Sequence, residues 1–148
     1  MRDHTKLRAY ELADQLALAI YKETRSFPRE EMFGLTSQLR RAAVSIASNI
    51  VEGSARSSEA ECLRFLDIAY GSARKVEYRV GLASRLGFLA ERSHRELSAL
   101  SVETSKVLSG LLRSLRKQQR PPVSSLQSPA FSPACSLQSA QYLIAKTC

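Results

Sequence analysis

Residues 27–53 read FPREEMFGLTSQLRRAAVSIASNIVEG, and this stretch decides the fold. Pro28 ends any helix that precedes it, because proline has no N–H group and a fixed φ angle. From Leu35 to Glu52 the chain contains neither proline nor glycine, so we predict a helix of about five turns there. Gly53 suits the left-handed conformation that often follows a helix, and we expect the helix to end at it.

The predicted helix has apolar or small side chains on almost every side. A helix on the outside of a small domain needs only one apolar stripe, whereas this one has two. The first consists of Leu39, Ala43, Ile46 and Ile50, and the second of Val44, Ala47 and Val51. The helix therefore lies either at the centre of a bundle or between subunits. In the second case Val44, Ala47 and Val51 form an oligomer interface.

Three more helices are predicted from apolar side chains that recur at intervals of three and four residues. They cover about residues 5–25, 58–86 and 93–120. Ser58–Glu61 and Ser93–Glu96 have the form of capping boxes, which predicts a side-chain cap at the start of the third and fourth helices. Gly87 ends the third helix. Inside it, Gly71 indicates either a close crossing of two helix backbones or a tolerated surface glycine.

Four such helices predict an all-α fold, an antiparallel up-and-down four-helix bundle over residues 1–120. Residues 121–148 are rich in Ser, Pro and Gln. A segment of this composition buries too little apolar surface to become ordered, so we predict a disordered tail. A chain of 148 residues is consistent with one domain and such a tail.

The formal net charge of +8 and the pI near 9.8 favour an acidic partner, which is a nucleic acid, an anionic membrane surface or an acidic protein. The charge belongs to the bundle, because Lys146 is the one charged residue of the tail. No signal peptide or membrane-spanning stretch is recognisable, so we expect a cytoplasmic protein without a membrane partner. Three cysteines without metal-ligand spacing indicate a reducing compartment and no metal or other cofactor.

No enzyme class emerges from the residues. A nucleophile needs a base within hydrogen-bond reach, and the chain has two histidines, His4 and His94, neither of which lies in a pattern of carboxylates or cysteines. We therefore predict a protein without catalytic residues.

The candidate nucleic-acid-binding residues are basic and lie on the second and third helices. They are Arg40, Arg41, Arg64, Arg74, Lys75 and Arg79. On a helix of 100° per residue, Arg64, Lys75 and Arg79 lie within about 60° of one another. Each of these two groups also has an interpretation without nucleic acid, and both interpretations stay open. In the first, Arg40 and Arg41 have a structural role, in which they pair with Glu52 or Glu77 of a neighbour or with loop carbonyls. In the second, the charges of the third helix form an ordinary solvated face.

Sequence-specific reading of bases is not expected, because no aromatic platform for unpaired bases is evident. Four aromatic residues fall at positions typical of packing, and these are Tyr10, Tyr21, Phe65 and Tyr70. Binding dominated by phosphate contacts is the most that the sequence predicts.

The run GLTSQLRRAAVSIASNIVEGSAR (residues 34–56), preceded by FPREE and followed by FLDIAYGSARKVE (residues 65–77), closely resembles the 23S rRNA intervening-sequence protein family. It is more distantly similar to the accessory variability protein of diversity-generating retroelements. The resemblance covers about residues 7–115. It implies a small bacterial four-helix bundle that forms a ring-like homopentamer and has no enzymatic activity. The retroelement relative binds nucleic acid and its partner reverse transcriptase.

One departure from the family pattern concerns charge. The family often has a Glu-Leu pair where this chain has Lys75-Val76, which makes the third helix more basic.

The sequence as a whole supports two hypotheses about function. The first is an oligomeric bundle that binds RNA or DNA through phosphates, and the second is a protein-interaction scaffold that does not bind nucleic acid itself.

Overall fold

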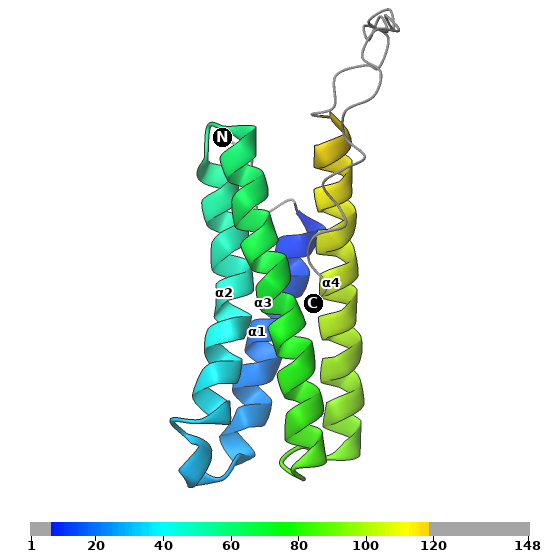
Figure 1. Cartoon of the computed structure of the whole chain (residues 1–148). Coiled ribbons are helices and arrows are strands. Elements are labelled where there is room, and N and C mark those ends of the chain that lie inside the picture. The colour runs from blue at the N-terminus through cyan, green and yellow to red at the C-terminus, as the bar shows by residue number, and fades with distance from the viewer. Residues whose placement is uncertain (1–6, 119–148) are drawn as a thin grey trace, which may run out of the picture.

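Four long helices make up the part of the chain that the computed structural model describes, residues 7–118. They are α1 (Arg8–Glu23), α2 (Leu35–Ala55), α3 (Glu59–Arg85) and α4 (Glu91–Gln118). Two short 3₁₀ turns, η2 (Thr24–Ser26) and η3 (Arg29–Glu31), connect α1 to α2. No strand occurs within residues 7–118. Successive helices run in opposite directions (Figure 1), so the predicted all-α antiparallel four-helix bundle is confirmed.

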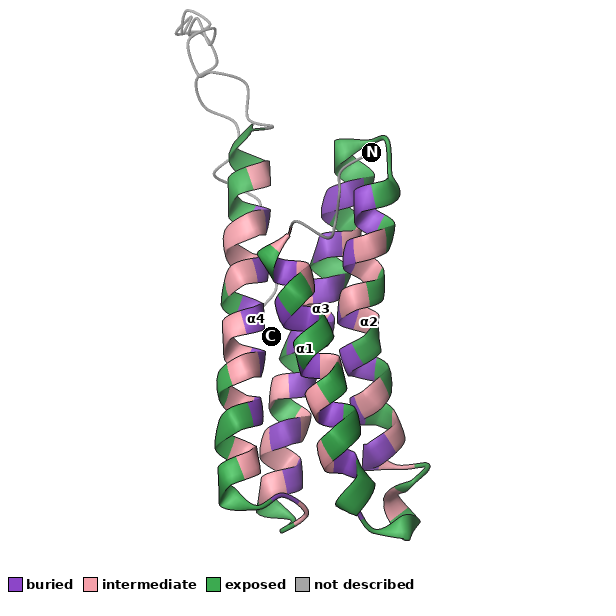
Figure 2. Cartoon of the chain, turned by 180° about the vertical axis from the view of Figure 1, so that it is seen from behind, coloured by how far each residue is buried: buried purple, intermediate pink, exposed green. Residues whose placement is uncertain are grey.

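The helices pack in a ring in which each has two main neighbours. α3 packs against α2 and α4, and α1 packs against the same two helices from the other side. Buried side chains line the inner faces, while the outer faces are exposed (Figure 2). Burying one Leu or Ile side chain stabilises the fold by about 1.5–3 kcal/mol. The largest fully buried apolar side chains are Leu16, Ile20, Leu39, Ile46, Ile50, Leu97 and Leu108.

The predicted capping boxes are wrong. Ser58 is the N-cap residue of α3, but its side chain makes no capping hydrogen bond. α4 begins at Glu91, two residues before Ser93, so the second box lies inside the first turn of the helix. Glu96 instead accepts a hydrogen bond of 2.9 Å from Nε of Arg92, and this bond raises the pKa of the Arg92 guanidinium.

The predicted role of Gly53 is wrong, and of the two alternatives for Gly71 the structure favours the surface glycine. Gly53 does not end α2, because the helix continues to Ala55. A Cβ atom on Gly53 would lie 3.0 Å from the Cβ of Phe65, so this glycine marks the close crossing of α2 and α3. A Cβ on Gly71 would meet nothing within 4 Å, so Gly71 is a surface glycine. Gly87 has a φ of 76° and follows α3, as predicted.

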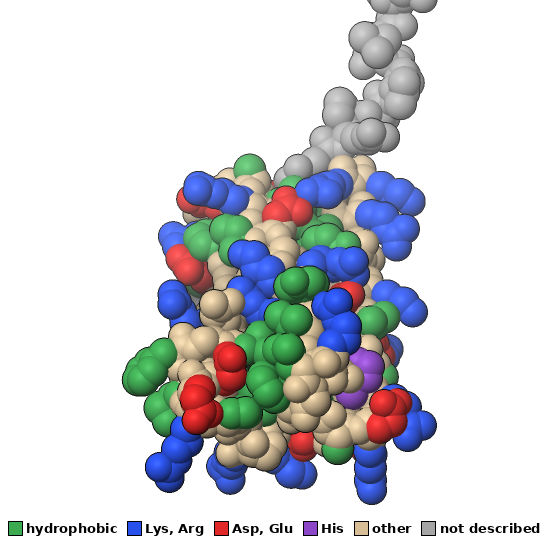
Figure 3. Space-filling view, turned by 60° about the horizontal axis from the view of Figure 1, so that its bottom comes forward, with side chains coloured by type: hydrophobic (Ala, Val, Ile, Leu, Met, Phe, Trp, Pro, Cys, Tyr) green, Lys and Arg blue, Asp and Glu red, His purple; other side chains and the backbone are tan. Residues whose placement is uncertain are grey.

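Both connections at one end of the bundle carry aromatic residues that contact each other. The rings of Phe27, before η3, and Phe88, after α3, lie 5.7 Å apart between centroids. Figure 3 shows this end, with hydrophobic side chains near the middle and Lys and Arg around them. The contact ties the α1–α2 connection to the α3–α4 connection.

Some of the sequence predictions concern residues outside the described range. These are the start of the first helix before Leu7 and the tail, residues 121–148. None of the helices in residues 7–118 is long and apolar enough to cross a membrane.

Candidate functional site

A hollow of about 280 Å³ with a basic lining lies between α2 and α3. It is lined by Gln38, Arg41, Ala42 and Ser45 of α2 and by Ser72, Lys75 and Arg79 of α3. Three of these side chains are cationic, two are hydroxyls and none is a carboxylate. Such a lining is suited to an anion that accepts hydrogen bonds, such as a phosphate group.

The spacing along the two helices explains why these side chains meet. Residues three, four or seven apart share one face of a helix, and the α2 and α3 residues of the hollow follow this spacing. Nη1 of Arg79 donates a hydrogen bond of 3.1 Å to the backbone carbonyl of Gln38. The Arg79 guanidinium is therefore held across the gap between α3 and α2, at the rim of the hollow.

Hydroxyl groups join the two helices at the hollow. The hydroxyl oxygens of Ser45 and Ser72 lie 3.0 Å apart, which links α2 to α3. Asn49 donates to the Ser45 hydroxyl at 3.0 Å and to the Ser45 carbonyl at 2.6 Å. Its amide thus fixes the Ser45 side chain.

The acid nearest to these cations in sequence is turned away from them. Glu77 stands between Lys75 and Arg79, yet its carboxylate accepts hydrogen bonds from Arg74, at 2.6 Å, and from the Ser105 hydroxyl of α4. Glu77 therefore faces α4. The positive charges of the hollow are not neutralised by a carboxylate in its lining.

Arg40 lies on the opposite flank of α2, against α1. Its Nε donates a hydrogen bond of 2.8 Å to Oγ1 of Thr24, and its guanidinium carbon lies 4.9 Å from the centre of the Tyr21 ring. The structure thus separates the two neighbouring arginines. Arg41 lines the hollow, whereas Arg40 holds the end of α1 onto α2.

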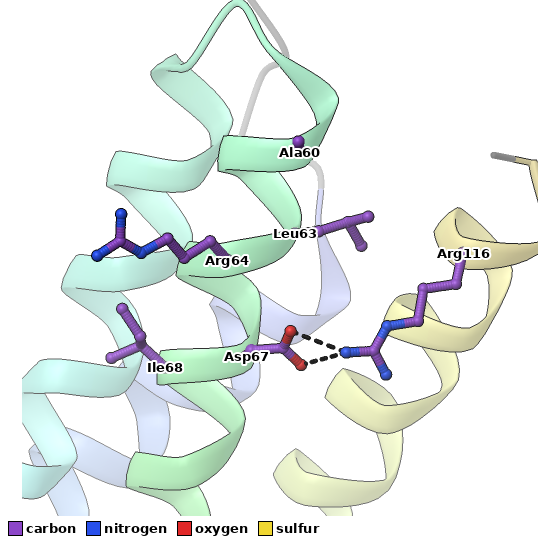
Figure 4. Close-up of a pocket in the computed structure, with 6 residues that line it drawn as sticks. All are labelled: Ala60, Leu63, Arg64, Asp67, Ile68 and Arg116. Atoms are coloured by element: carbon purple, nitrogen blue, oxygen red, sulfur yellow. Dashed lines mark hydrogen bonds and ion pairs between the residues drawn. The ribbon is translucent and has the colours of Figure 1, made fainter.

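Arg64 and Arg74 lie outside the hollow too. Arg64 is eleven residues from Lys75 on α3, which corresponds to about 16 Å along the helix axis. Figure 4 shows Arg64 pointing away from the pair that Asp67 forms with Arg116 of α4, at N–O distances of 2.7 and 2.8 Å. Arg74 belongs to the α4 side of α3 through Glu77. Of the six predicted cations, Arg41, Lys75 and Arg79 are brought together.

The predicted interface stripe shares its flank of α2 with Arg40, because Arg40, Val44, Ala47 and Val51 follow one another at helical spacing. Val44 is 42% exposed, whereas Ala47 and Val51 are half-buried. The stripe thus lies on the α1 side of α2, and the basic hollow lies on the α3 side. Its role as an oligomer interface stays a prediction.

Two other depressions differ from the hollow in chemistry. A cavity of about 320 Å³ between the helices is mostly apolar, and its lining includes Leu7, Ile50 and Cys62. A groove of about 230 Å³ between α3 and α4 contains three cations, Arg74, Lys106 and Arg113, but the carboxylate of Glu77 lies among them. Residues 7–118 contain no cluster of His, Cys, Asp or Glu able to hold a metal ion.

The sequence predictions missed the neutral members of the hollow and did not single out Tyr78, an exposed aromatic residue of α3. Ser45 and Ser72 have short side chains on different helices, so only the pairing of α2 with α3 reveals that they meet. Tyr78 does carry a signal, since it follows Lys75 by three residues and belongs to no apolar stripe of α3.

Comparison with protein families matches residues 5–110 to the family described as 23S rRNA-intervening sequence protein. Among solved structures, the chain is similar to a protein of unknown function from the S23 ribosomal protein family of Bacteroides thetaiotaomicron. The TM-score is 0.66 and the sequence identity 24%, over 71% of this chain and 95% of that chain. This likeness shows the fold alone. Comparison with curated proteins found no match.

Proposed function

Because the chain belongs to the 23S rRNA-intervening sequence protein family, we propose that it is a non-enzymatic bundle that binds nucleic acid through phosphate groups. The family description names an intervening sequence of ribosomal RNA. The description of the structural neighbour names no activity.

The observation that carries the proposal is the lining of the hollow between α2 and α3. Arg41, Lys75 and Arg79 converge on it without a carboxylate, and the Ser45 and Ser72 hydroxyls add further hydrogen-bonding groups. Lys and Arg side chains are spread widely over the face shown in Figure 3, so net charge alone does not select a binding site. The hollow between α2 and α3 is selected because three cations converge on it and its lining contains no carboxylate, whereas Glu77 lies among the cations of the α3–α4 groove.

Assembly would multiply this charge. We propose a homo-oligomer, and the family resemblance implies a pentamer. The exposure of Val44 on the α1 side of α2 supports a contact there. A contact on that flank leaves the hollow on the α3 flank open to ligand, so each subunit of a ring would present one hollow.

The test is fluorescence anisotropy with a labelled single-stranded RNA at salt concentrations from about 50 to 200 mM. Phosphate contacts release counterions, so the logarithm of the affinity should fall linearly with the logarithm of the salt concentration. Replacing the three cations together, as Arg41→Gln, Lys75→Gln and Arg79→Gln, should reduce the slope by about 2, because each contact to a single strand contributes about 0.7.

A matched control removes the same charge elsewhere. Arg92→Gln, Arg95→Gln and Arg113→Gln together lower the net charge equally but leave the hollow intact, and this variant should keep a slope near that of the wild type. Light scattering on every variant shows whether the assembly is preserved. Equal slopes for the two triple variants would place the binding site elsewhere, and the absence of binding at about 50 mM salt would refute the proposal.

A second function is favoured by a different observation. Apolar side chains are exposed along α1, on α2 and on the connection between them, with Leu18 at 66% and Phe33 at 90% exposure. Exposed apolar surface of this kind can bind another protein. A scaffold without nucleic-acid binding of its own is therefore the alternative, and the anisotropy experiment separates it from the first proposal.

A further inference from the structure

Tyr78 is an exposed aromatic residue on the outer face of α3. Its side chain is 65% exposed, although most aromatic side chains of the described bundle are at least half-buried. α3 lies between α2 and α4 with its outer face uncovered (Figure 1). The phenol ring of Tyr78 is thus available for contact from solvent.

The helix places Tyr78 at the edge of the basic hollow. Lys75 precedes it by three residues, so the two Cβ atoms are neighbours at about 5–6 Å. Arg74, one turn before Tyr78, is its neighbour on the other side, and Arg79 is adjacent in sequence. An aromatic ring within a group of cations is the arrangement with which proteins hold unpaired nucleotides, since the cations bind the backbone and the ring stacks on a base.

The surface around Tyr78 is uncrowded along the helix. Gly71 and Gly81 lie seven residues before and three residues after it, positions that share its side of the helix. A Cβ atom at either glycine would meet nothing within 4 Å. A flat ligand can therefore approach the ring without displacing a neighbouring side chain at these two positions.

We propose that Tyr78 stacks on an unpaired base of a strand whose phosphate occupies the hollow of Arg41, Lys75 and Arg79. The inference rests on the proposed function and narrows it from nucleic acid in general to single-stranded segments. It departs from the expectation that the chain has no aromatic platform for bases, which rested on Tyr10, Tyr21, Phe65 and Tyr70.

Charge favours a nucleotide over a second copy of the chain as the occupant. The groups around Tyr78 are Arg74, Lys75 and Arg79, and the one acid among them, Glu77, is bound to α4. A second copy, itself basic, would bring cations against cations. A nucleotide supplies both the anion for the hollow and the ring for Tyr78.

The test uses three labelled probes on the full chain: a short oligoadenylate, the same strand with abasic positions, and a duplex of equal length. Wild-type protein should bind the oligoadenylate on the order of tenfold more tightly than the abasic strand, as expected for one stacked base. Tyr78→Leu, which keeps an apolar side chain but loses the aromatic ring, should bind both strands alike. Tyr78→Phe should retain the preference.

Phe33→Leu is the matched control, because it replaces the other highly exposed ring of residues 7–118 and should leave the preference intact. The slope of the logarithm of the affinity against the logarithm of the salt concentration separates phosphate binding in the hollow from base stacking on Tyr78. If wild type and Tyr78→Leu bind the strands and the duplex equally, with a slope that depends on Arg41, Lys75 and Arg79, stacking is refuted while phosphate binding stands. If Tyr78→Leu instead dissociates the assembly, Tyr78 belongs to a protein contact and the inference is overturned.

Discussion

Gly53 of α2 lies against Phe65 of α3 so closely that a Cβ atom on the glycine would stand 3.0 Å from the Cβ of Phe65. The same atom would stand 3.3 Å from the carbonyl oxygen of Cys62. Real Cβ atoms rarely make contacts this short, and the second partner is backbone. The missing side chain therefore allows α2 and α3 to cross closely near the turn that joins them.

Gly53→Ala and Gly71→Ala should change stability in opposite directions. Alanine favours a helix over glycine by about 1 kcal/mol, and at Gly71 nothing opposes this gain. At Gly53 the new methyl group forces the two backbones apart, at a cost of about 1–3 kcal/mol. Urea unfolding followed by circular dichroism measures both effects. A gain of stability in both variants would show that the crossing relaxes without cost.

The arrangement of four helices is predictable from the sequence because the apolar period is a local property. Leu39, Ile46 and Ile50 recur at the spacing of one helix face, and the structure buries all three. Pro28 and Gly87 mark two of the connections for reasons that need no knowledge of the partner helix. Fold class and helix order follow from such residues.

The candidate site was only partly predictable, because a helical angle says which side chains share a face but not which helix covers that face. Arg64 shares a face with Lys75 and Arg79, yet lies about three turns from Lys75 and about four turns from Arg79 along α3. Arg40 and Arg41 are adjacent in sequence, and packing sends one to α1 and the other to α3. The roles of Gly53 and Gly71 likewise depend on where α2 and α3 cross.

Arg40→Gln should destabilise the bundle without changing nucleic-acid binding. The substitution removes the hydrogen bond to Thr24 and the contact with the Tyr21 ring, which together contribute about 1–2 kcal/mol. Because Arg40 lies on the α1 flank of α2, the salt slope of binding should equal that of the wild type. A reduced slope, measured by anisotropy, would show that Arg40 contacts a phosphate of the nucleic acid.

Val44→Asp should dissociate the oligomer and leave the subunit folded. Val44 is 42% exposed in the subunit, so a carboxylate there is solvated in the monomer but would lose its solvent in an interface, at a cost of several kcal/mol. Ile68→Asp is the matched control, because Ile68 is 44% exposed and lies on α3. Light scattering and circular dichroism together distinguish dissociation from unfolding. A wild-type monomer, or an intact Val44→Asp oligomer, would remove this stripe from the interface.

Glu77→Ala should cost more stability than the loss of an ordinary surface acid. Glu77 is mostly buried, with 16% of its side chain exposed, and it accepts hydrogen bonds from Arg74 and from the buried Ser105 hydroxyl. Its removal leaves Ser105 without that acceptor, so we expect a loss of about 1–3 kcal/mol. Glu96→Ala is the control, because Glu96 forms an exposed pair with Arg92 that contributes at most about 1 kcal/mol. Urea unfolding of both variants decides the matter, and equal losses would show that Glu77 does not tie α3 to α4.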